Sequence, residues 1–462
     1  MRNPHIAPTL AALLLTLGLG SLATSHAAGR PAAPPITRIE YDGTLYFEAH
    51  FRHPGDVHPY HSHAVYVTDA VGNARLDWTT WEAGDSVRVA ETYLLTQGRV
   101  VHRDAPGQPW QEYTGSRARQ ARLQASAGLP APLEIITRAE PDKGGVWQRS
   151  GGQLSRYTFL QAHPRLGDVR DTVFYGYKRG DRAPDSLALA LTMRGANWRL
   201  TARRTAWSRD ALPDSLFALP GAIAPAPPEE DDETLERVPA FAQVADGVWS
   251  LELNDIDSRT VVVEFADHLA MLELAASSAN GERIVDAAHQ MWPNKPIRYA
   301  LFSHYHPHYT GGLRAAIAAG ATIVTTPGNE AFVRHLATLP FKTAPDRLER
   351  HPMPVHVTTF VDSIVLGDDR NQLVAYNYGE RSMHTDEFVL FWLPRQQLLF
   401  ETEMGWSKAN GTVRAGRRAR GLLTWIAEKH FDVERILQGW PMRDNDAVKM
   451  PGELEVLAPK SP

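Results

Sequence analysis

The sequence contains no cysteine among its 462 residues. This absence excludes disulfide bonds, a cysteine nucleophile and thiolate metal ligands. Any bound metal ion must therefore be held by histidine, aspartate or glutamate side chains. No apolar run reaches the ~20 residues that a transmembrane helix needs, so we expect no membrane anchor in the mature chain.

The sequence also lacks a strong charge imbalance, with a formal net charge of -5. This balance gives no electrostatic reason to expect a nucleic-acid partner. No G-x-G-x-x-G motif follows a strand pattern and no G-x-S-x-G motif occurs, so neither a dinucleotide fold nor a serine hydrolase is supported. The length favours two or three domains.

The N-terminus is typical of a secretory signal. Arg2 provides a positive start, and an apolar run from Ala11 to Ala23 follows it. Ser25-His26-Ala27 places small residues where a signal peptidase reads them. We therefore expect a signal peptide over residues 1–27 and a periplasmic or secreted mature protein.

Composition divides the remainder of the chain. Residues 28–37 are rich in Ala and Pro and indicate a linker. Residues 38–219 show a mostly β pattern. Residues 220–237 combine several prolines with the acidic run Glu229–Glu233, which cannot build a core. We expect a second linker there and an α/β domain over residues 238–462.

Apolar and polar residues alternate in several segments of the β-rich part, among them 44–51, 187–194 and 198–203. Glycine-containing turns separate these segments, which favours an antiparallel sheet. The pattern loosely resembles the curved half-barrel of periplasmic lipoprotein-carrier proteins, and an unrelated β-sandwich is the alternative. Four histidines lie early in this part, namely His53, His58, His61 and His63. They indicate either a metal site or an ordinary polar loop.

Three histidines at alternate positions lie in the segment Ser303–Gly312, with the sequence SHYHPHYTGG. A period of two points alternate side chains the same way, and neutral imidazoles suit zinc. The segment follows the apolar run Ile297–Phe302 and precedes the helix-like run Leu313–Ala319. This arrangement resembles the H-x-H-x-D-H-x-G-G loop of the metallo-β-lactamase superfamily. The resemblance covers residues 238–440 and implies an αβ/βα sandwich.

The resemblance implies a first metal site made of three histidines. His304 and His306 match the first two histidines of the motif. His384 precedes an apolar strand that ends at Pro394, as the third histidine of the family does. Glu403 stands where the family places a bridging aspartate, and we expect it to be a further metal ligand.

The second metal site of the family is largely missing. His308 replaces its aspartate, Tyr309 replaces its loop histidine and Trp440 replaces its C-terminal histidine. Two zinc ions close together repel each other, and the anions that offset this repulsion are mostly absent here. We expect one bound zinc ion, with His308 as an additional candidate ligand.

Two functions remain open. One is an exported zinc-dependent hydrolase that uses a zinc-bound water on an ester, amide or lactam, with Glu403 or His308 as general base. Tyr309 and Tyr305 are candidate hydrogen-bond donors to an oxyanion, or they simply pack beneath the loop. The alternative is an inactive relative that acts as a ligand-binding or assembly module. If the β-rich part encloses an apolar ligand, either function suits a small hydrophobic or cell-envelope molecule. The basic cluster Arg414, Arg417, Arg418 and Arg420 indicates a solvated helix face.

Overall fold

The computed structural model describes residues 36–48, 52–69, 73–82, 84, 89–103, 105–113, 146–180, 184–193, 196–210, 212–225, 235, 238–405, 416–440 and 448–449. The expected signal peptide and most of both expected linkers lie outside these residues. Within them, no helix is both long and apolar enough to cross a membrane.

Twelve strands form one sheet in the order β12-β6-β5-β4-β3-β2-β1-β11-β10-β9-β8-β7. Neighbouring strands are antiparallel except β12 and β6, which are parallel. The strands are β1 (Ile36–Glu48), β2 (His58–Thr68), β3 (Ala74–Glu82), β4 (Val89–Thr96), β5 (Arg99–Arg103), β6 (Trp110–Tyr113), β7 (Val146–Ser150), β8 (Gln153–His163), β9 (Gly167–Gly176), β10 (Ser186–Met193), β11 (Ala196–Asp210) and β12 (Ile223–Pro225).

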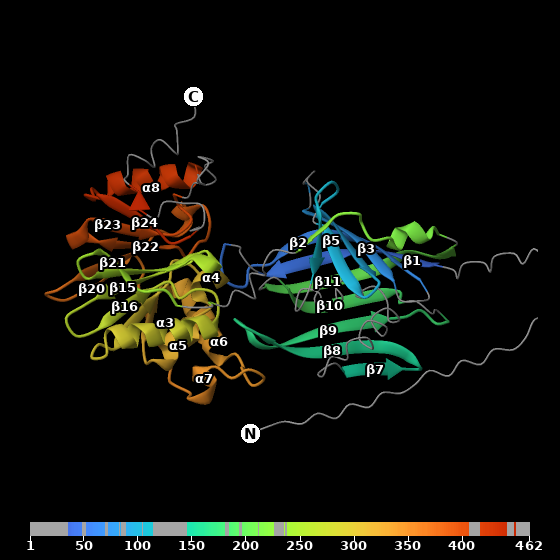
Figure 1. Cartoon of the computed structure of the whole chain (residues 1–462), viewed down its shortest axis with the longest axis horizontal. Helices are drawn as coiled ribbons and strands as arrows, with labels where there is room; N and C mark the ends of the chain where they lie inside the picture. The colour runs from blue at the N-terminus through green and yellow to red at the C-terminus, as the bar shows by residue number, and fades with distance from the viewer. Residues whose placement is uncertain are drawn as a thin grey trace, which may run out of the picture.

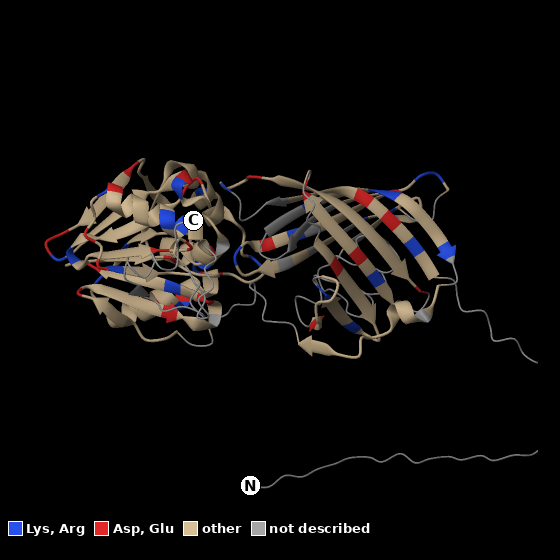
Figure 2. Cartoon of the chain, turned by 90° about the horizontal axis from the view of Figure 1, so that it is seen from above, with Lys and Arg blue, Asp and Glu red and all other residues tan. Residues whose placement is uncertain are grey.

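This sheet is curved, as Figure 2 shows. Alternate residues of β1, namely Ile39, Tyr41 and Leu45, share one buried cluster, as the two-residue period of a strand requires. The register shifts between Glu40 and Tyr41, an irregularity of the kind that bends a strand. The predicted antiparallel β domain is therefore confirmed, and its described strands form one sheet rather than two packed sheets.

Two further sheets make up the C-terminal half. One has the order β13-β14-β15-β16-β17-β18-β19 and the other β20-β21-β22-β23-β24-β25. The first contains β13 (Ala242–Ala245), β14 (Val248–Leu253), β15 (Ser258–Glu264), β16 (Leu269–Leu272), β17 (Ile297–Leu301), β18 (Thr322–Thr325) and β19 (His356–Thr359). The second contains β20 (Ser363–Gly367), β21 (Gln372–Asn377), β22 (Val389–Leu393), β23 (Leu398–Glu401), β24 (Arg435–Gln438) and β25 (Val448–Lys449).

Helices cover the outer faces of both sheets (Figure 1). On the first sheet lie α3 (Ser278–Met291), α5 (Leu313–Ala318), α6 (Pro327–Thr338) and α7 (Arg347–Arg350), and on the second lies α8 (Gly416–Glu428). The short α4 (Pro307–Thr310) lies in the loop after β17, at the edge of the domain. Short 3-10 segments span Asp214–Phe217, Asn254–Ile256, Gly379–Ser382 and Pro394–Gln396.

Three buried clusters separate these layers. One lies between the first sheet and α3, α5 and α6, and a second lies between the two sheets. A third lies between the second sheet and α8. Helix, sheet, sheet and helix therefore follow one another, so the predicted αβ/βα sandwich is confirmed.

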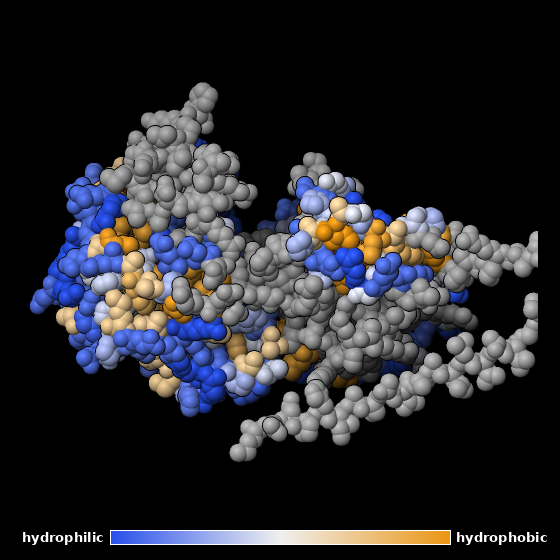
Figure 3. Space-filling model, viewed as in Figure 1, coloured by the Kyte–Doolittle hydropathy of each residue, from blue (hydrophilic) through white to orange (hydrophobic). Residues whose placement is uncertain are grey.

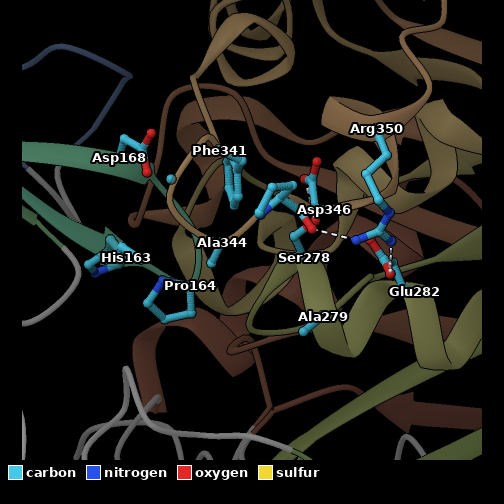
Figure 4. Close-up of a pocket in the computed structure, with 13 residues that line it drawn as sticks. His163, Pro164, Asp168, Ser278, Ala279, Glu282, Phe341, Ala344, Asp346 and Arg350 are labelled. Atoms are coloured by element: carbon cyan, nitrogen blue, oxygen red, sulfur yellow. Dashed lines mark hydrogen bonds and ion pairs between the residues drawn. The ribbon is translucent and has the colours of Figure 1, made fainter.

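The two halves lie side by side and contact each other through the β8–β9 turn (Figure 1). Arg165 Nε donates to the Ala276 carbonyl at 2.6 Å, and Asp168 N donates to the Pro340 carbonyl at 2.6 Å. A pocket of about 550 Å³ lies at this junction. Figure 4 shows the hairpin residues His163 and Asp168 on one side of this pocket.

The charged and apolar parts of the surface are mixed. Basic and acidic residues are interspersed on the strands of the β domain in Figure 2. On the face drawn in Figure 3, apolar side chains gather in small groups among hydrophilic ones. These views agree with the modest net charge of the chain.

Candidate metal centre

Four expected ligands come together at the ends of strands of the two sheets. His304 and His306 follow β17, and Glu403 follows β23. His384 lies after the 3-10 segment Gly379–Ser382 and before β22. His304, His306 and Glu403 are at most 5% exposed, and the His384 side chain is 14% exposed. One ligand atom from each of the four residues lies within 4.8 Å of the others.

The spacing of these atoms fits a metal ion. His304 Nε2 lies 3.1 Å from His306 Nδ1, and 3.4 Å from Glu403 Oε1. His384 Nε2 lies 2.8 Å from Glu403 Oε2. Two nitrogens bound to one tetrahedral zinc, each at ~2.0–2.1 Å, are about 3.3 Å apart. The three imidazoles and the carboxylate therefore suit zinc in both chemistry and spacing.

A hydrogen-bonded chain fixes the orientation of His304. Its Nδ1 lies 2.9 Å from Ser303 Oγ, which accepts a hydrogen bond from Thr402 Oγ1 at 2.8 Å. The ring of His304 also stacks on the ring of Phe388, at a centroid distance of 4.9 Å. Outer partners of this kind direct the remaining ring nitrogen toward a metal. Here they direct Nε2 toward His306 and Glu403.

Glu403 is the anion of the centre. Burial raises its pKa, but hydrogen bonds and charges from His304 and His384 outweigh burial and hold the pKa well below the usual range. The side chain is therefore ionised at neutral pH. An ionised carboxylate of low basicity is better suited to ligation than to general-base catalysis, which works best when the pKa is near the working pH.

Tyr309 lies beneath this carboxylate rather than beside a reacting atom. Its side chain is fully buried, and its hydroxyl donates to Glu403 Oε1 at 2.9 Å. Burial and the charges of Glu403 and Glu273 raise its pKa well above 10. The phenol therefore stays protonated, and its one proton is already donated to Glu403. Of the two roles that the sequence left open for Tyr309, this geometry agrees with packing beneath the loop, where Tyr309 supports Glu403, rather than with an oxyanion donor.

His308 points to a different neighbour. Its ring stacks on Trp440 with a centroid distance of 5.7 Å and an angle of 2°. The group of potential metal ligands does not include it. Because His308 and Trp440 pair with each other, the structure gives no support to His308 as a ligand or general base. The stacking occupies the two positions where the superfamily has an aspartate and a histidine.

Arg418 is a site residue that the sequence analysis missed. It lies in the first turn of α8, and its side chain is 25% exposed. Its Nη1 lies 3.2 Å from Glu403 Oε2, and its Nη2 lies 3.0 Å from His384 Nδ1. The expectation that the whole basic cluster forms a solvated helix face is therefore wrong for Arg418.

The early histidines do not gather into a metal site among the described residues. Each has another neighbour: His53 Nδ1 lies 3.4 Å from Asp386, His58 Nε2 lies 3.5 Å from Asp56, His61 stacks on Trp81, and His63 Nδ1 lies 2.6 Å from Asp42. A second group of potential ligands is Asp267, His268 and Asp368. There Asp267 already pairs with Arg298, and Asp368 accepts backbone N–H groups.

Several residues around the centre have a left-handed backbone. Glu273, Ala276, Met383 and Glu403 have φ between 52° and 71° although none is glycine. Such residues are uncommon and carry a conformational cost of the order of 1 kcal/mol each. Met383 precedes His384, and Glu403 is itself a candidate ligand. Strain of this kind is typical of functional sites.

No protein-family model matches this chain, and the comparison with curated proteins gives no match. Solved structures are similar to about half of it. A metallo-β-lactamase from Erythrobacter litoralis is 18% identical, with 47% of this chain and 93% of that chain covered and a TM-score of 0.33. The FIM-1 metallo-β-lactamase of Pseudomonas aeruginosa, solved in a mono-zinc form, is 16% identical, with 49% and 96% covered and a TM-score of 0.34.

A metallo-β-lactamase from Hirschia baltica is 16% identical, with 48% and 98% of the two chains covered and a TM-score of 0.34. The layers and the histidine loop of this chain carry the fold assignment by themselves. His304 and His306 follow a strand of one sheet, and His384 and the carboxylate lie beside strands of the other, within a helix–sheet–sheet–helix sandwich. The C-terminal half of this protein has the αβ/βα fold of the metallo-β-lactamases.

Proposed function

We propose that this protein is an exported, metal-dependent hydrolase that binds one zinc ion and cleaves an ester, amide or lactam bond of a small molecule. The observation that carries the proposal is the convergence of His304, His306, His384 and Glu403 within 4.8 Å. Buried imidazoles and a carboxylate rarely gather so closely unless a metal ion or a catalytic role stabilises them.

His304 Nε2, His306 Nδ1, His384 Nε2 and a Glu403 oxygen would hold the metal. When bound, zinc would supply a Lewis acid and lower the pKa of a coordinated water to ~7. The protein itself orients these ligands. Ser303 and Thr402 position His304, and Tyr309 holds Glu403 through a hydrogen bond of 2.9 Å.

The stacking of His308 on Trp440 favours a single metal ion. In the superfamily these positions would serve a second metal. Here they present an aromatic pair that brings no negative charge, and Glu403 is the one carboxylate in the ligand group. Two divalent cations with one carboxylate between them would repel each other strongly.

The same pair supports the alternative, in which the centre binds a ligand without catalysis. His308 and Trp440 fill part of the region where a second metal would act in an active relative. We retain this alternative because the choice between the two depends on activity. Export is proposed from the N-terminal sequence alone, with its apolar run and small residues before Ala28.

Metal analysis of the purified mature protein tests the proposal. We expect about one zinc per chain in the wild type and in His308→Ala, because His308 lies outside the ligand group. His306→Ala should lose the zinc together with any hydrolysis of an ester, amide and lactam panel. His308→Ala is a matched control because both variants remove an imidazole from the same loop.

Each other result has a clear meaning. One zinc without hydrolysis of any substrate on the panel favours the ligand-binding alternative. A wild type without zinc contradicts the metal centre itself. Two zinc ions in the wild type, with one lost in His308→Ala, would show that His308 leaves Trp440 to complete a second site.

A further inference from the structure

The Arg418 guanidinium makes two contacts inside the candidate metal centre. One nitrogen lies 3.2 Å from Glu403 Oε2, and the other lies 3.0 Å from His384 Nδ1. Among the described residues, the Glu403 carboxylate also contacts the side chains of His304, His384 and Tyr309. His384 Nε2 and this permanent cation therefore share Oε2 of the carboxylate, whereas Oε1 contacts His304 and Tyr309.

The contact with His384 has a chemical consequence. A guanidinium can only donate hydrogen bonds, so Nδ1 of His384 must supply the lone pair and its proton must be on Nε2. A neutral imidazole that binds a metal through Nε2 carries its proton on Nδ1 instead. Arg418 in this position therefore holds His384 in the tautomer that does not bind the metal.

The charge of Arg418 acts in the same direction. A cation beside Glu403 repels any divalent ion that approaches the same carboxylate, and it offsets part of the negative charge that would attract one. The side chain is 25% exposed, so solvent screens it only in part. Both its hydrogen bond and its charge compete with a metal ion.

We propose that the Arg418 guanidinium is the second cation of this centre and takes the place of a second metal ion. The same guanidinium competes with the first metal ion for His384 and Glu403. The proposal rests on the metal centre proposed above. In this proposal, the guanidinium of Arg418 replaces the positive charge of the second metal ion. One zinc and one guanidinium then compete for the single carboxylate, where active relatives of the fold would place two metal ions.

Zinc affinity measured against a competing chelator tests this role without any assay of hydrolysis. Arg418→Gln should bind the first zinc at least about ten-fold more tightly than the wild type, the scale on which neighbours of metal ligands act. Arg418→Lys should lie between the two, because lysine keeps the charge but cannot contact Glu403 and His384 with one planar fork. Arg417→Gln, an exposed neighbour on the same helix, should match the wild type.

A merely structural Arg418 predicts the opposite sign. If the guanidinium only holds His384 and Glu403 in place, its removal weakens zinc binding. Equal or weaker affinity in Arg418→Gln therefore overturns the proposal. Arg418→Met, a second neutral variant of similar length, keeps the test available if the glutamine variant fails to fold, and circular dichroism shows which variants are folded.

The outcomes separate this proposal from the proposed hydrolase. A wild type that binds one zinc and hydrolyses nothing leaves the Arg418 proposal intact, because affinity is measured directly. Zinc bound by Arg418→Gln and not by the wild type supports it. Absence of zinc from both proteins overturns it together with the metal centre.

Discussion

Glu273 is a carboxyl group closed off from water beneath the histidine loop. It is 0% exposed, and its Oε1 accepts a hydrogen bond from Ser303 N at 2.8 Å. Its other oxygen has no hydrogen-bond partner among the described residues. Burial raises its pKa to about 8, although the bonds from Ser303 oppose this rise. A raised carboxyl pKa stabilises the protonated native state.

This pKa predicts how the stability of the metal-free protein depends on pH. Below about pH 4.5 the group is protonated in both the native and the unfolded state, and its stabilisation is fully present. Between there and pH 8 the unfolded chain loses the proton while the native state keeps it. The free energy of unfolding should therefore fall as pH rises, by up to about 1.4 kcal/mol per pH unit.

Glu273→Gln removes this titration and keeps an oxygen that can accept from Ser303 N. Urea unfolding of both proteins at several pH values between 5 and 8, with chelator present, measures the difference. The variant should gain stability relative to the wild type as pH rises. Parallel stability curves would contradict the raised pKa.

At the scale of the elements, patterns with a short period were predictable from the sequence. The apolar runs before the histidine loop and after His384 are β17 and β22, and the run Leu313–Ala318 is α5. The segment Val244–Trp249 has the composition of one continuous strand, but Gly247, with φ of 65°, makes a turn there between β13 and β14. The turn could not be recognised from the sequence pattern, because apolar residues lie on both sides of it.

Contacts between distant elements could not be predicted in the same way. The ring of His308 reaches Trp440, and Arg418 reaches His384, through packing that no local period records. An arginine on a basic helix face is usually exposed to solvent. Its long side chain turns inward only when a buried carboxylate lies within reach. Sequence spacing therefore located the four candidate ligands but not their cationic neighbour.

The ion pair between Arg314 of α5 and Asp346 before α7 is one such distant contact. Arg314 Nε donates to Asp346 Oδ2 at 2.5 Å and Nη2 donates to Oδ1 at 3.0 Å, and both side chains are at most 5% exposed. Arg314→Met should lower the free energy of unfolding by ~3–5 kcal/mol, because it leaves a buried charge without its partner.

Arg334→Met is the matched control. Its ion pair with Glu330 is exposed, with 52% and 39% of the two side chains accessible, and its loss should cost no more than ~0.5 kcal/mol. Denaturant unfolding measures both values. Similar losses in the two variants would show that the buried pair contributes no more than a surface one.

At the scale of the whole molecule, two sets of contacts between described residues join the β domain to the α/β domain. The β8–β9 turn lies against the N-terminus of α3, where Arg165 and Pro164 contact Ala276 and Ser278. Arg52 contacts Asp386 through both its side chain and its carbonyl. Because Asp386 is two residues from His384, the β domain supports the loop that carries a candidate ligand.

The pocket beside the β8–β9 turn is part of the contact between the two domains rather than a second ligand site. Its polar side chains are occupied by neighbours: Ser278 donates to Asp346, Arg350 pairs with Glu282, and Asp168 accepts from Lys342 N and Thr343 N (Figure 4). The geometry of the turn is what allows the two domains to approach here.

Gly167 makes this approach possible. Its φ is 69°, and a Cβ atom there would lie 2.2 Å from the Pro340 carbonyl oxygen and 2.5 Å from the Phe341 ring. Gly167→Ala should therefore separate the hairpin from the α/β domain, which small-angle scattering would record as a larger radius of gyration.

Gly151→Ala is the matched control, because Gly151 has φ of 58° and no atom lies within 4 Å of a Cβ at that position. The control shares the backbone strain of ~1 kcal/mol without the clash. An unchanged radius in Gly167→Ala, or equal changes in both variants, would show that this turn does not hold the domains together.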